Sequence, residues 1–317
     1  MKIAYTDIDH PSLDIERSVF SKAGMEFTIN QCRTEDEVIE KCRDADILIN
    51  QCAPITQRVI DSLPNFKLVV RYGVGVDNVD VSAAVQRGIK VCNIPDYGTC
   101  EVADHALALM MALVRKIPFI NDFTKTQKWD CTASFPIRRL SEQTVGIIGF
   151  GRIGKAFAER VHALGCRIIA CDHHLMPGEI HSCGYVTGVT LTEVLQQSDI
   201  ISIHCPPLKN AYMIDSEAFK LVKKGVYIIN DARGGIIDEA ALDAALEDGT
   251  VAGAALDVMK QEPMPANSPI YRHKNLIVSP HMGWYSIEAS ADLKRKVAEQ
   301  VVKFVQTGKV DYPVYKN

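Results

Sequence analysis

The chain has 317 residues, more than one ordinary domain and fewer than three, so we expect two domains. It is 47% hydrophobic and 23% charged, which fits a soluble globular protein and excludes a largely disordered one. Lys and Arg number 35 against 39 Asp and Glu, a net charge of −4, whereas a dedicated nucleic-acid binder usually carries a basic excess. No apolar run approaches the roughly 18 residues that span a bilayer, and the N-terminus shows no signal-peptide core. We therefore expect a cytoplasmic protein with no direct nucleic-acid partner and no membrane partner.

Ten cysteines are spread from Cys32 to Cys205 without CxxC spacing. A chain of this length builds its own core and does not need disulfides, so we interpret the cysteines as reduced and mostly buried. The adjacent pairs His173-His174 and His204-Cys205 do not have metal-ligand spacing, because neighbours on a strand point to opposite faces. The sequence therefore predicts no metal site.

Short β-branched runs alternate with amphipathic stretches along the whole chain. The runs predict strands at residues 2–5, 47–49, 68–71, 90–92, 144–148, 167–171, 200–204, 226–230 and 276–279. The stretches predict helices at 34–43, 81–86, 101–114, 152–163, 215–221, 239–247 and 287–306. This alternation indicates an α/β fold with parallel sheets and right-handed crossovers. We expect one domain over residues 1–98 plus 285–317 and a second over 99–284.

The predicted strand Thr144–Ile148 is followed by a GxGxxG motif, Gly149, Gly151 and Gly154, and then by a helical pattern. In a dinucleotide site, the first glycine permits a tight turn and the second lets the backbone approach a pyrophosphate. The third allows the helix to pack closely on the strand. The helix N-terminus supplies free N–H groups to the anion. The context predicts a dinucleotide-binding turn, which the motif alone would not.

Asp172 ends the next predicted strand, 18 residues after Gly154. This is close to where dinucleotide-binding domains carry an acidic residue for the ribose hydroxyls. A carboxylate there repels a 2′-phosphate, so Asp172 favours NAD over NADP. The alternative is that Asp172 only caps the loop before His173.

Three polar residues follow later strands and are candidates for chemistry. Arg233 offers a permanently charged fork suited to a carboxylate or carbonyl, although a surface salt bridge would explain it equally. His281 lies between Pro280 and Met282, where a packed or surface histidine is the commoner case. A carboxylate such as Glu262 beside a histidine makes a general acid, because the negative charge favours the protonated ring. The spacing alone does not bring these two side chains together.

The motif order resembles the D-isomer-specific 2-hydroxyacid dehydrogenases. The resemblance rests on GFGRIG at 149–154, Asp172, NDARGGIIDEAAL at 230–242, ALDVMKQEP at 255–263 and SPHMGW at 279–284. Residues 71–80, 93–98 and 101–105 extend it over nearly the full chain. Within the family, residues 94–116, 280–290 and above all Trp284 are most similar to the C-terminal-binding proteins. The resemblance implies two Rossmann-like or flavodoxin-like domains with the active site in the interdomain cleft and hinges near 95–101 and 283–287.

The resemblance also implies a role for each matching residue. His281 donates a proton to the carbonyl oxygen as hydride arrives from the nicotinamide, Glu262 holds the ring, and Arg233 grips the substrate carboxylate. The implied cofactor-binding residues are Gly149, Gly151, Arg152, Ile153, Gly154, Asp172, Cys205, Pro206, Ala232 and Asp257, the last near the nicotinamide carboxamide. The implied substrate-binding residues are Arg71, Tyr72, Gly73, Val74, Gly75 and Trp284. Asp231 departs from the pattern, since this position is often small or carries a hydroxyl.

Two functions stay open. The first is an NAD-dependent D-2-hydroxyacid dehydrogenase that transfers hydride between NAD(H) and a small 2-oxo acid. The second is an NAD(H)-sensing corepressor scaffold like the C-terminal-binding proteins. The presence of all three catalytic residues favours the enzyme. The family likeness also predicts a homodimer through helix 101–114 and the arm with Trp129 and Phe135, unless that helix is simply core.

The expected substrate is an unbranched or thioether-bearing 2-oxo acid rather than phosphohydroxypyruvate. Trp284 lies three residues after His281, so a short turn would point its apolar ring toward the same substrate. No Arg or Lys occurs in residues 73–77 to serve as a second anion site. The alternative is that Trp284 packs under the hinge and never meets substrate.

Overall fold

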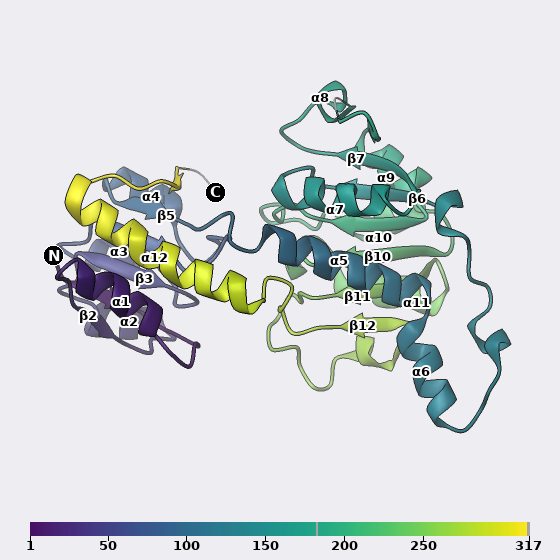
Figure 1. Cartoon of the computed structure of the whole chain (residues 1–317), viewed down its shortest axis with the longest axis horizontal. Coiled ribbons are helices and arrows are strands. Elements are labelled where there is room, and N and C mark those ends of the chain that lie inside the picture. Colours follow the sequence, from purple (N-terminus) through teal and green to yellow (C-terminus); the bar gives the residue numbers. More distant parts are fainter. Residues whose placement is uncertain (182, 316–317) are drawn as a thin grey trace. The chain divides into compact units, whose positions relative to one another are not determined.

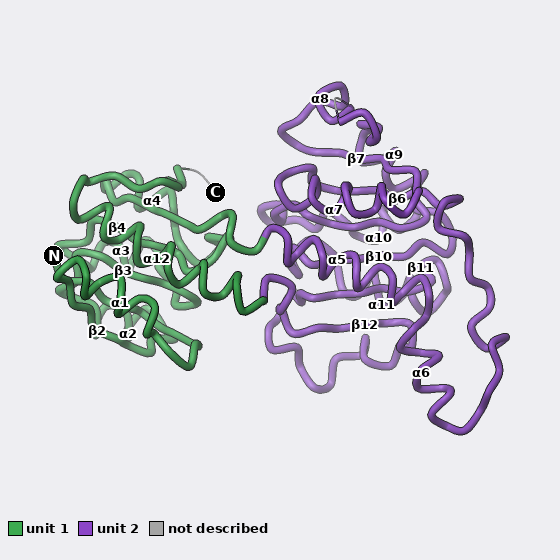
Figure 2. Tube along the Cα trace, viewed as in Figure 1, with its two compact units in different colours: residues 1–98, 286–317 green, residues 99–285 purple. Residues whose placement is uncertain are grey.

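The computed structural model describes residues 1–181 and 183–315 and divides into two compact units. Unit 1 consists of Met1–Gly98 and Ser286–Asn317, and unit 2 of Thr99–Tyr285 (Figure 2). Unit 2 therefore ends one residue beyond the predicted 284. Each unit is built around its own mainly parallel sheet. The α/β fold class predicted from the sequence is confirmed.

Unit 1 contains a six-stranded sheet in the order β13-β5-β4-β3-β1-β2. Its strands are β1 (Ile3–Tyr5), β2 (Phe27–Ile29), β3 (Ile47–Asn50), β4 (Leu68–Arg71), β5 (Lys90–Cys92) and the antiparallel edge strand β13 (Pro313–Val314). Its helices are α1 (Asp14–Lys22), α2 (Glu35–Lys41), α3 (Gln57–Ser62), α4 (Val81–Gln86) and α12 (Ile287–Thr307). One core lies between the sheet and helices α2, α3 and α4. Helices α1 and α12 pack against each other, and α12 also contacts β4 (Figure 1).

Unit 2 contains a seven-stranded sheet in the order β12-β11-β10-β9-β6-β7-β8, with every pair parallel. The strands are β6 (Thr144–Ile148), β7 (Arg167–Cys171), β8 (Val186–Gly188), β9 (Ile200–Ile203), β10 (Val226–Asn230), β11 (Val251–Leu256) and β12 (Leu276–Val278). The helices are α5 (Thr99–Val114), α6 (Ile117–Lys125), α7 (Arg152–His162), α8 (Pro177–His181), α9 (Leu191–Gln197), α10 (Ser216–Leu221) and α11 (Glu239–Glu247). Short 3₁₀ turns are η1 (Cys131–Ser134), η2 (Leu140–Glu142), η3 (Gly234–Ile236) and η4 (Pro269–Arg272).

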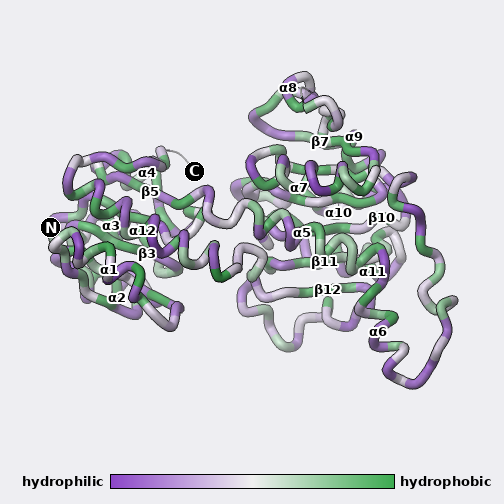
Figure 3. Tube along the Cα trace, in the orientation of Figure 1, coloured by the Kyte–Doolittle hydropathy of each residue, from purple (hydrophilic) through white to green (hydrophobic). Residues whose placement is uncertain are grey.

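Two cores cover the two faces of the unit 2 sheet. Helices α5 and α7 lie side by side over one face, and α9, α10 and α11 cover the other (Figure 1). The central strands are accordingly hydrophobic along their length, as expected for a parallel sheet buried on both sides (Figure 3). The strand order reverses at β6, whose neighbours are β7 and β9. Ligands of open α/β sheets bind outside the carboxyl ends of the strands at such a switch point.

The structure also bears on the cysteines, metals and membranes. All ten cysteines are free thiols, and five of them are buried. Within residues 1–181 and 183–315, no cluster of His, Cys, Asp and Glu has the geometry to hold a metal ion. In the same ranges, none of the helices combines the length and hydrophobicity that a bilayer crossing requires.

Candidate active site

The GxGxxG turn joins β6 to α7 with a geometry that requires glycine at its first and third positions. Gly149 has a φ of +93°, and a Cβ there would lie 2.7 Å from the His204 backbone. A Cβ on Gly154 would lie 2.1 Å from the Gly149 carbonyl oxygen. A Cβ on Gly151 would meet nothing within 4 Å, so the chain itself does not need glycine there. Glycine at 151 instead leaves space for a ligand to approach the start of α7.

Asp172 directly follows β7, next to this turn. Its carboxylate accepts hydrogen bonds from the backbone N–H groups of Phe150 and His174, both at 2.7 Å. The Phe150 contact ties the end of β7 to the glycine turn and fixes the position of the negative charge. The exposed Arg152 and the half-buried Ile153 begin the first turn of α7. The open space at Gly151, the free helix N-terminus and the acidic group after the neighbouring strand together fit an NAD molecule.

The remaining predicted cofactor residues follow three neighbouring strands. Cys205 and the exposed Pro206 come after β9, and Ala232 comes after β10. Asp257 directly follows β11 and is 2% exposed. Its carboxylate accepts from the Ser279 hydroxyl at 2.6 Å and from the backbone N–H groups of Met282 at 3.0 Å and Gly283 at 2.8 Å. Asp257 thus supports the 279–283 loop, and its predicted contact with the carboxamide stays a prediction.

His281 and Glu262 meet, although 19 positions separate them in the sequence. The distance between His281 Nδ1 and Glu262 Oε2 is 2.7 Å, and the two side chains are 43% and 39% exposed. Glu262 Oε1 accepts the Met259 backbone N–H at 2.9 Å. Burial alone would raise the pKa of Glu262, but the hydrogen bonds from His281 and Met259, with the Arg233 charge, hold it below its usual range. An ionised carboxylate therefore faces the imidazole at neutral pH.

Arg233 comes within electrostatic reach of this pair because the chain passes very close to itself. A Cβ on Gly234 would lie 1.9 Å from the Met259 carbonyl carbon, so only glycine allows the turn after β10 to pack against the turn after β11. Asn230 fixes the turn, since its side chain donates to the Arg233 carbonyl at 2.9 Å and accepts from the Ala232 N–H at 3.1 Å. The structure thus groups Arg233, Glu262 and His281 at one edge of the unit 2 sheet.

The predicted substrate residues Arg71–Gly75 begin with the last residue of β4, at the carboxyl edge of the unit 1 sheet. Gly73 has a φ of +144°, and the Arg71 guanidinium lies directly over it. Val74 is exposed, and its carbonyl accepts from the Asn93 side chain at 2.6 Å. This loop presents backbone groups and one cation at a strand end, as a carboxylate site requires.

Tyr72 differs from its neighbours, because its side chain serves the interior of unit 1. The residue is 4% exposed, and its hydroxyl donates to the buried Glu16 carboxylate at 2.6 Å. Burial and the charge of Glu16 raise the pKa of Tyr72. Within unit 1 the Tyr72 ring is therefore buried, and its predicted contact with substrate stays a prediction.

Trp284 follows the buried Gly283 and is itself half-buried. Its ring meets the Tyr285 ring edge-on, with centroids 5.5 Å apart. Two further residues were not singled out from the sequence as site residues. His105 on α5 and Ser279 both contact the Asp257 carboxylate behind His281. No sequence signal could have shown this, because the three residues come from separate parts of the chain.

The fold and this edge of the unit 2 sheet define a dinucleotide-binding protein of the doubly wound α/β class. Residues 107–283 match the family model "D-isomer specific 2-hydroxyacid dehydrogenase, NAD binding domain". The chain is 39% identical over 261 residues to D-3-phosphoglycerate dehydrogenase of Bacillus subtilis, covering 82% of this chain and 49% of that protein. It is 35% identical to hydroxypyruvate reductase of Blautia hydrogenotrophica, covering 87% of each. The chain belongs to the D-isomer-specific 2-hydroxyacid dehydrogenase family.

A solved structure extends the likeness to both units. The glyoxylate reductase from Paecilomyes thermophila superposes with a TM-score of 0.88 at 26% identity, covering 99% of this chain and 98% of that one. The chain spans about half the length of the Bacillus subtilis enzyme that it matches. These relatives are named as enzymes and give no support to the corepressor alternative.

Proposed function

We propose that this chain is an NAD-dependent D-2-hydroxyacid dehydrogenase, acting on a small 2-oxo acid in one direction and on the 2-hydroxy acid in the other. The observation that carries the proposal is the 2.7 Å contact between His281 and Glu262, with Arg233 close enough to lower the pKa of the same carboxylate. A histidine paired with an ionised carboxylate is a general acid suited to neutral pH. A cation beside it suits a substrate that is itself an anion.

The proton transfer follows from which imidazole nitrogen is engaged. His281 Nδ1 is held by Glu262, so Nε2 is the atom that donates a proton to the substrate carbonyl oxygen in reduction. In oxidation the same atom accepts the hydroxyl proton. The negative charge of Glu262 stabilises the imidazolium form before the proton leaves. Bound NADH supplies the hydride that reaches the carbonyl carbon.

Arg233 orients the substrate in this proposal. The Arg233 guanidinium binds the substrate carboxylate and polarises the adjacent carbonyl. The 73–75 loop of unit 1 stays a predicted carboxylate-binding segment, with the Val74 and Gly75 N–H groups as its neutral donors, because the Gly73 N–H already donates to the Arg71 carbonyl at 3.0 Å. Orientation by fixed donors accounts for a large part of the barrier reduction in such reactions.

We further propose a preference for a substrate without a phosphate. The backbone N–H groups that follow β3, those of Gln51, Cys52 and Ala53, already bind the buried Asp7 carboxylate at 3.1, 2.6 and 3.2 Å. These donors are thus not free for a second anion. An unbranched or thioether substrate side chain suits the apolar ring of Trp284 better than a phosphorylated side chain does. The discrimination is about 1–3 kcal/mol for each well-placed group.

A panel of 2-oxo acids tests the proposal. NADH oxidation is followed with pyruvate, glyoxylate, hydroxypyruvate, 3-phosphohydroxypyruvate and longer unbranched and thioether 2-oxo acids. We expect turnover with at least one of the unphosphorylated acids and a loss of roughly 100-fold or more in kcat/KM for Arg233→Ala. Tight NADH binding without turnover on the whole panel would instead favour a cofactor-binding scaffold.

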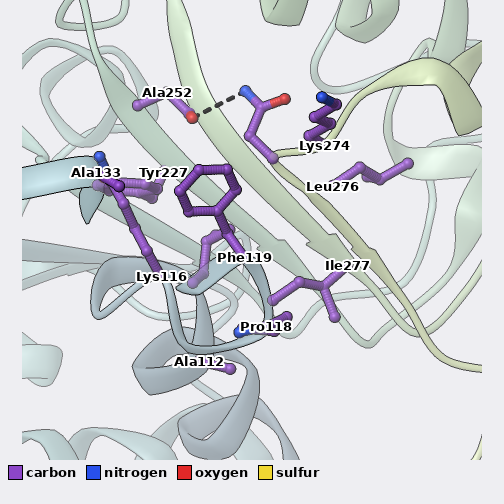
Figure 4. A pocket seen from close by; sticks show the side chains of 12 residues that line it. Ala112, Lys116, Pro118, Phe119, Ala133, Tyr227, Ala252, Lys274, Leu276 and Ile277 are labelled. Atoms are coloured by element: carbon purple, nitrogen blue, oxygen red, sulfur yellow. Dashed lines mark hydrogen bonds between the residues drawn. The ribbon is translucent and has the colours of Figure 1, made fainter. Parts of the chain in front are cut away.

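We also propose a homodimer formed through α5, α6 and the arm that follows. A cavity of about 260 Å³ opens between these helices and the amino ends of β10, β11 and β12. Apolar side chains line it, among them Phe119 on α6, Leu276 and Ile277 (Figure 4). Trp129 and Phe135, on the same arm, are 93% and 64% exposed. The occupant we propose is an aromatic side chain from the arm of a second copy.

We propose a cytoplasmic location as well. Ten free thiols, with none of them paired, are what a reducing compartment maintains. Fractionation of cells that express the protein tests this directly.

A further inference from the structure

The loop that carries His281 has a strained backbone. His281 has a φ of +53°, in the left-handed region that residues with a Cβ rarely adopt. Its backbone N–H donates to the Asp257 carbonyl at 2.8 Å, and the Met282 and Gly283 N–H groups donate to the Asp257 carboxylate. Such conformations cost on the order of 1–3 kcal/mol and persist only where the surroundings impose them. Asp257 is therefore what holds the loop.

Asp257 is in turn held by two residues that the proposed reaction does not use. The Ser279 hydroxyl donates to Asp257 Oδ1 at 2.6 Å, and His105 Nε2 lies 3.0 Å from the Ser279 oxygen and 3.3 Å from Asp257 Oδ1. Because the Ser279 hydroxyl donates its only proton to Asp257, the Ser279 oxygen must accept in its contact with the imidazole of His105, and His105 Nε2 is the donor. The His105 ring thus joins helix α5 to the loop.

The charges at this point favour the arrangement. The hydrogen bond to Asp257 raises the pKa of His105 against the opposing effect of burial, and the charges of Asp257 and Asp231 act in the same direction. Burial would raise the pKa of Asp257, but its hydrogen bonds with His105, Ser279 and the loop lower it. Gly283 packs closely against both side chains, since a Cβ at this position would lie 3.1 Å from both Asp257 Oδ2 and the His105 ring.

We propose that His105 is a positioning residue, which acts through Ser279 and Asp257 to fix the 279–283 loop and so keeps the His281 imidazole on Glu262. The consequence for turnover rests on the proposed function, whereas the consequence for the His281–Glu262 hydrogen bond does not. His105, which lies on α5 and outside the 279–283 loop, thereby determines whether the His281 imidazole is aligned. Misplacement of a reacting group by about 1 Å costs on the order of 100-fold in rate.

The test compares His105→Leu, which removes the donor, with His105→Gln, which keeps an N–H at similar reach. The first readout is the downfield proton resonance of the His281 Nδ1–H on Glu262, assigned by its absence in His281→Gln. The second is kcat on the best 2-oxo acid, and the third is the NADH dissociation constant. We expect His105→Leu to lose or broaden the resonance and lower kcat about 10- to 100-fold, with a smaller change in NADH affinity. His105→Gln should restore both.

Ser279→Ala covers the case in which His105→Leu does not fold, and it should weaken the same resonance. A sharp resonance in His105→Leu, or equal losses in the Leu and Gln variants, would overturn the proposal. So would a drop in NADH affinity as large as the drop in kcat. If the wild-type protein turns over no 2-oxo acid, the proposed function fails, while the resonance still decides the role of His105.

Discussion

At the residue scale, the pairing of Glu262 with His281 makes the reaction depend on pH. The pKa of the Glu262 carboxyl lies below its usual value, so the negative charge is present through the neutral range and is lost only in acid. A depressed carboxyl pKa likewise adds stability above the unfolded-state value, and that stability disappears as the pH falls through the folded-state pKa. At and above neutral pH, the charge therefore favours the imidazolium needed for reduction.

We predict that Glu262→Gln moves the alkaline limb of the reduction profile to lower pH. The amide can still accept the Nδ1–H, but it no longer stabilises the positive ring. Both side chains are partly exposed, so we expect a displacement of about one pH unit, the lower end for an adjacent charge. The measurement is kcat/KM against pH between 5 and 10, with NADH affinity as the control. An unmoved alkaline limb would remove Glu262 from this role.

Asp172 leads to a prediction on cofactor choice. Its carboxylate is fixed by the Phe150 and His174 N–H groups, so the charge cannot turn away from a 2′-phosphate. We expect the wild-type protein to prefer NADH over NADPH. Asp172→Ala should lower the ratio of kcat/KM with NADH to kcat/KM with NADPH about tenfold, equivalent to about 1.4 kcal/mol. Asp172→Asn is the matched control, because it removes the charge and keeps an acceptor. Equal use of both cofactors by the wild type would show the assignment to be wrong.

The sequence indicates local turn geometry where a motif fixes the backbone, and it does not show side-chain contacts that only the tertiary fold creates. Gly149 and Gly154 could be identified because the turn itself demands glycine. The partner of Tyr72 could not, since Glu16 on α1 looks like an ordinary surface residue until the fold buries it. His105 was equally hidden, because its role depends on two strand ends distant in sequence.

At the element scale, the strand-turn-helix of β6 and α7 separates the needs of folding from those of binding. We predict that Gly151→Ala leaves the melting temperature near that of the wild type, since its Cβ would meet nothing within 4 Å. NADH affinity should nevertheless fall at least tenfold, because the methyl group occupies the approach to the helix N-terminus. Calorimetry and NADH fluorescence titration measure the two effects.

The comparison with Gly154→Ala makes this prediction sharper. There the methyl would lie 2.1 Å from the Gly149 carbonyl oxygen, so we expect both stability and binding to be lost. Gly178→Ala on α8, which also has open space, should change neither. If Gly151→Ala binds NADH normally, the cofactor does not approach at Gly151.

Elements were predictable from sequence where β-branched residues cluster. All nine predicted strands are present, but β11 was missed because its sequence, Val-Ala-Gly-Ala-Ala-Leu, carries only one β-branched residue. The structure explains its small side chains. A Cβ on Gly253 would lie 2.8 Å from the Asn275 carbonyl oxygen and 2.9 Å from Leu113 on α5, so the neighbouring backbone leaves no room for a side chain there. Strands β2, β8 and β13 lie at sheet edges and are largely not buried, so no apolar run marks them in the sequence.

At the scale of the whole molecule, residues 117–135 after α5, which comprise α6 and the arm, carry apolar surface that the described part of unit 2 does not cover. Ile117 and Phe119 on α6 are exposed in addition to Trp129 and Phe135. Exposed aromatic residues beside an apolar cavity are typical of a protein–protein interface. A second copy satisfies both features at once, because each arm would fill the cavity of the other in a two-fold arrangement.

We therefore predict a dimer in light scattering at micromolar concentration and a shift toward monomer in Phe135→Ser. Met176→Ser, which removes an equally exposed apolar side chain on the same unit, should leave the dimer intact. The chain has only two tryptophans, so a Trp284→Phe background isolates Trp129. Its emission should be blue-shifted in the dimer, where the indole leaves water, and red-shifted after Phe135→Ser. A wild-type monomer at all accessible concentrations, or a dimer that Phe135→Ser and Trp129→Ser both leave unchanged, would place the interface elsewhere or remove it.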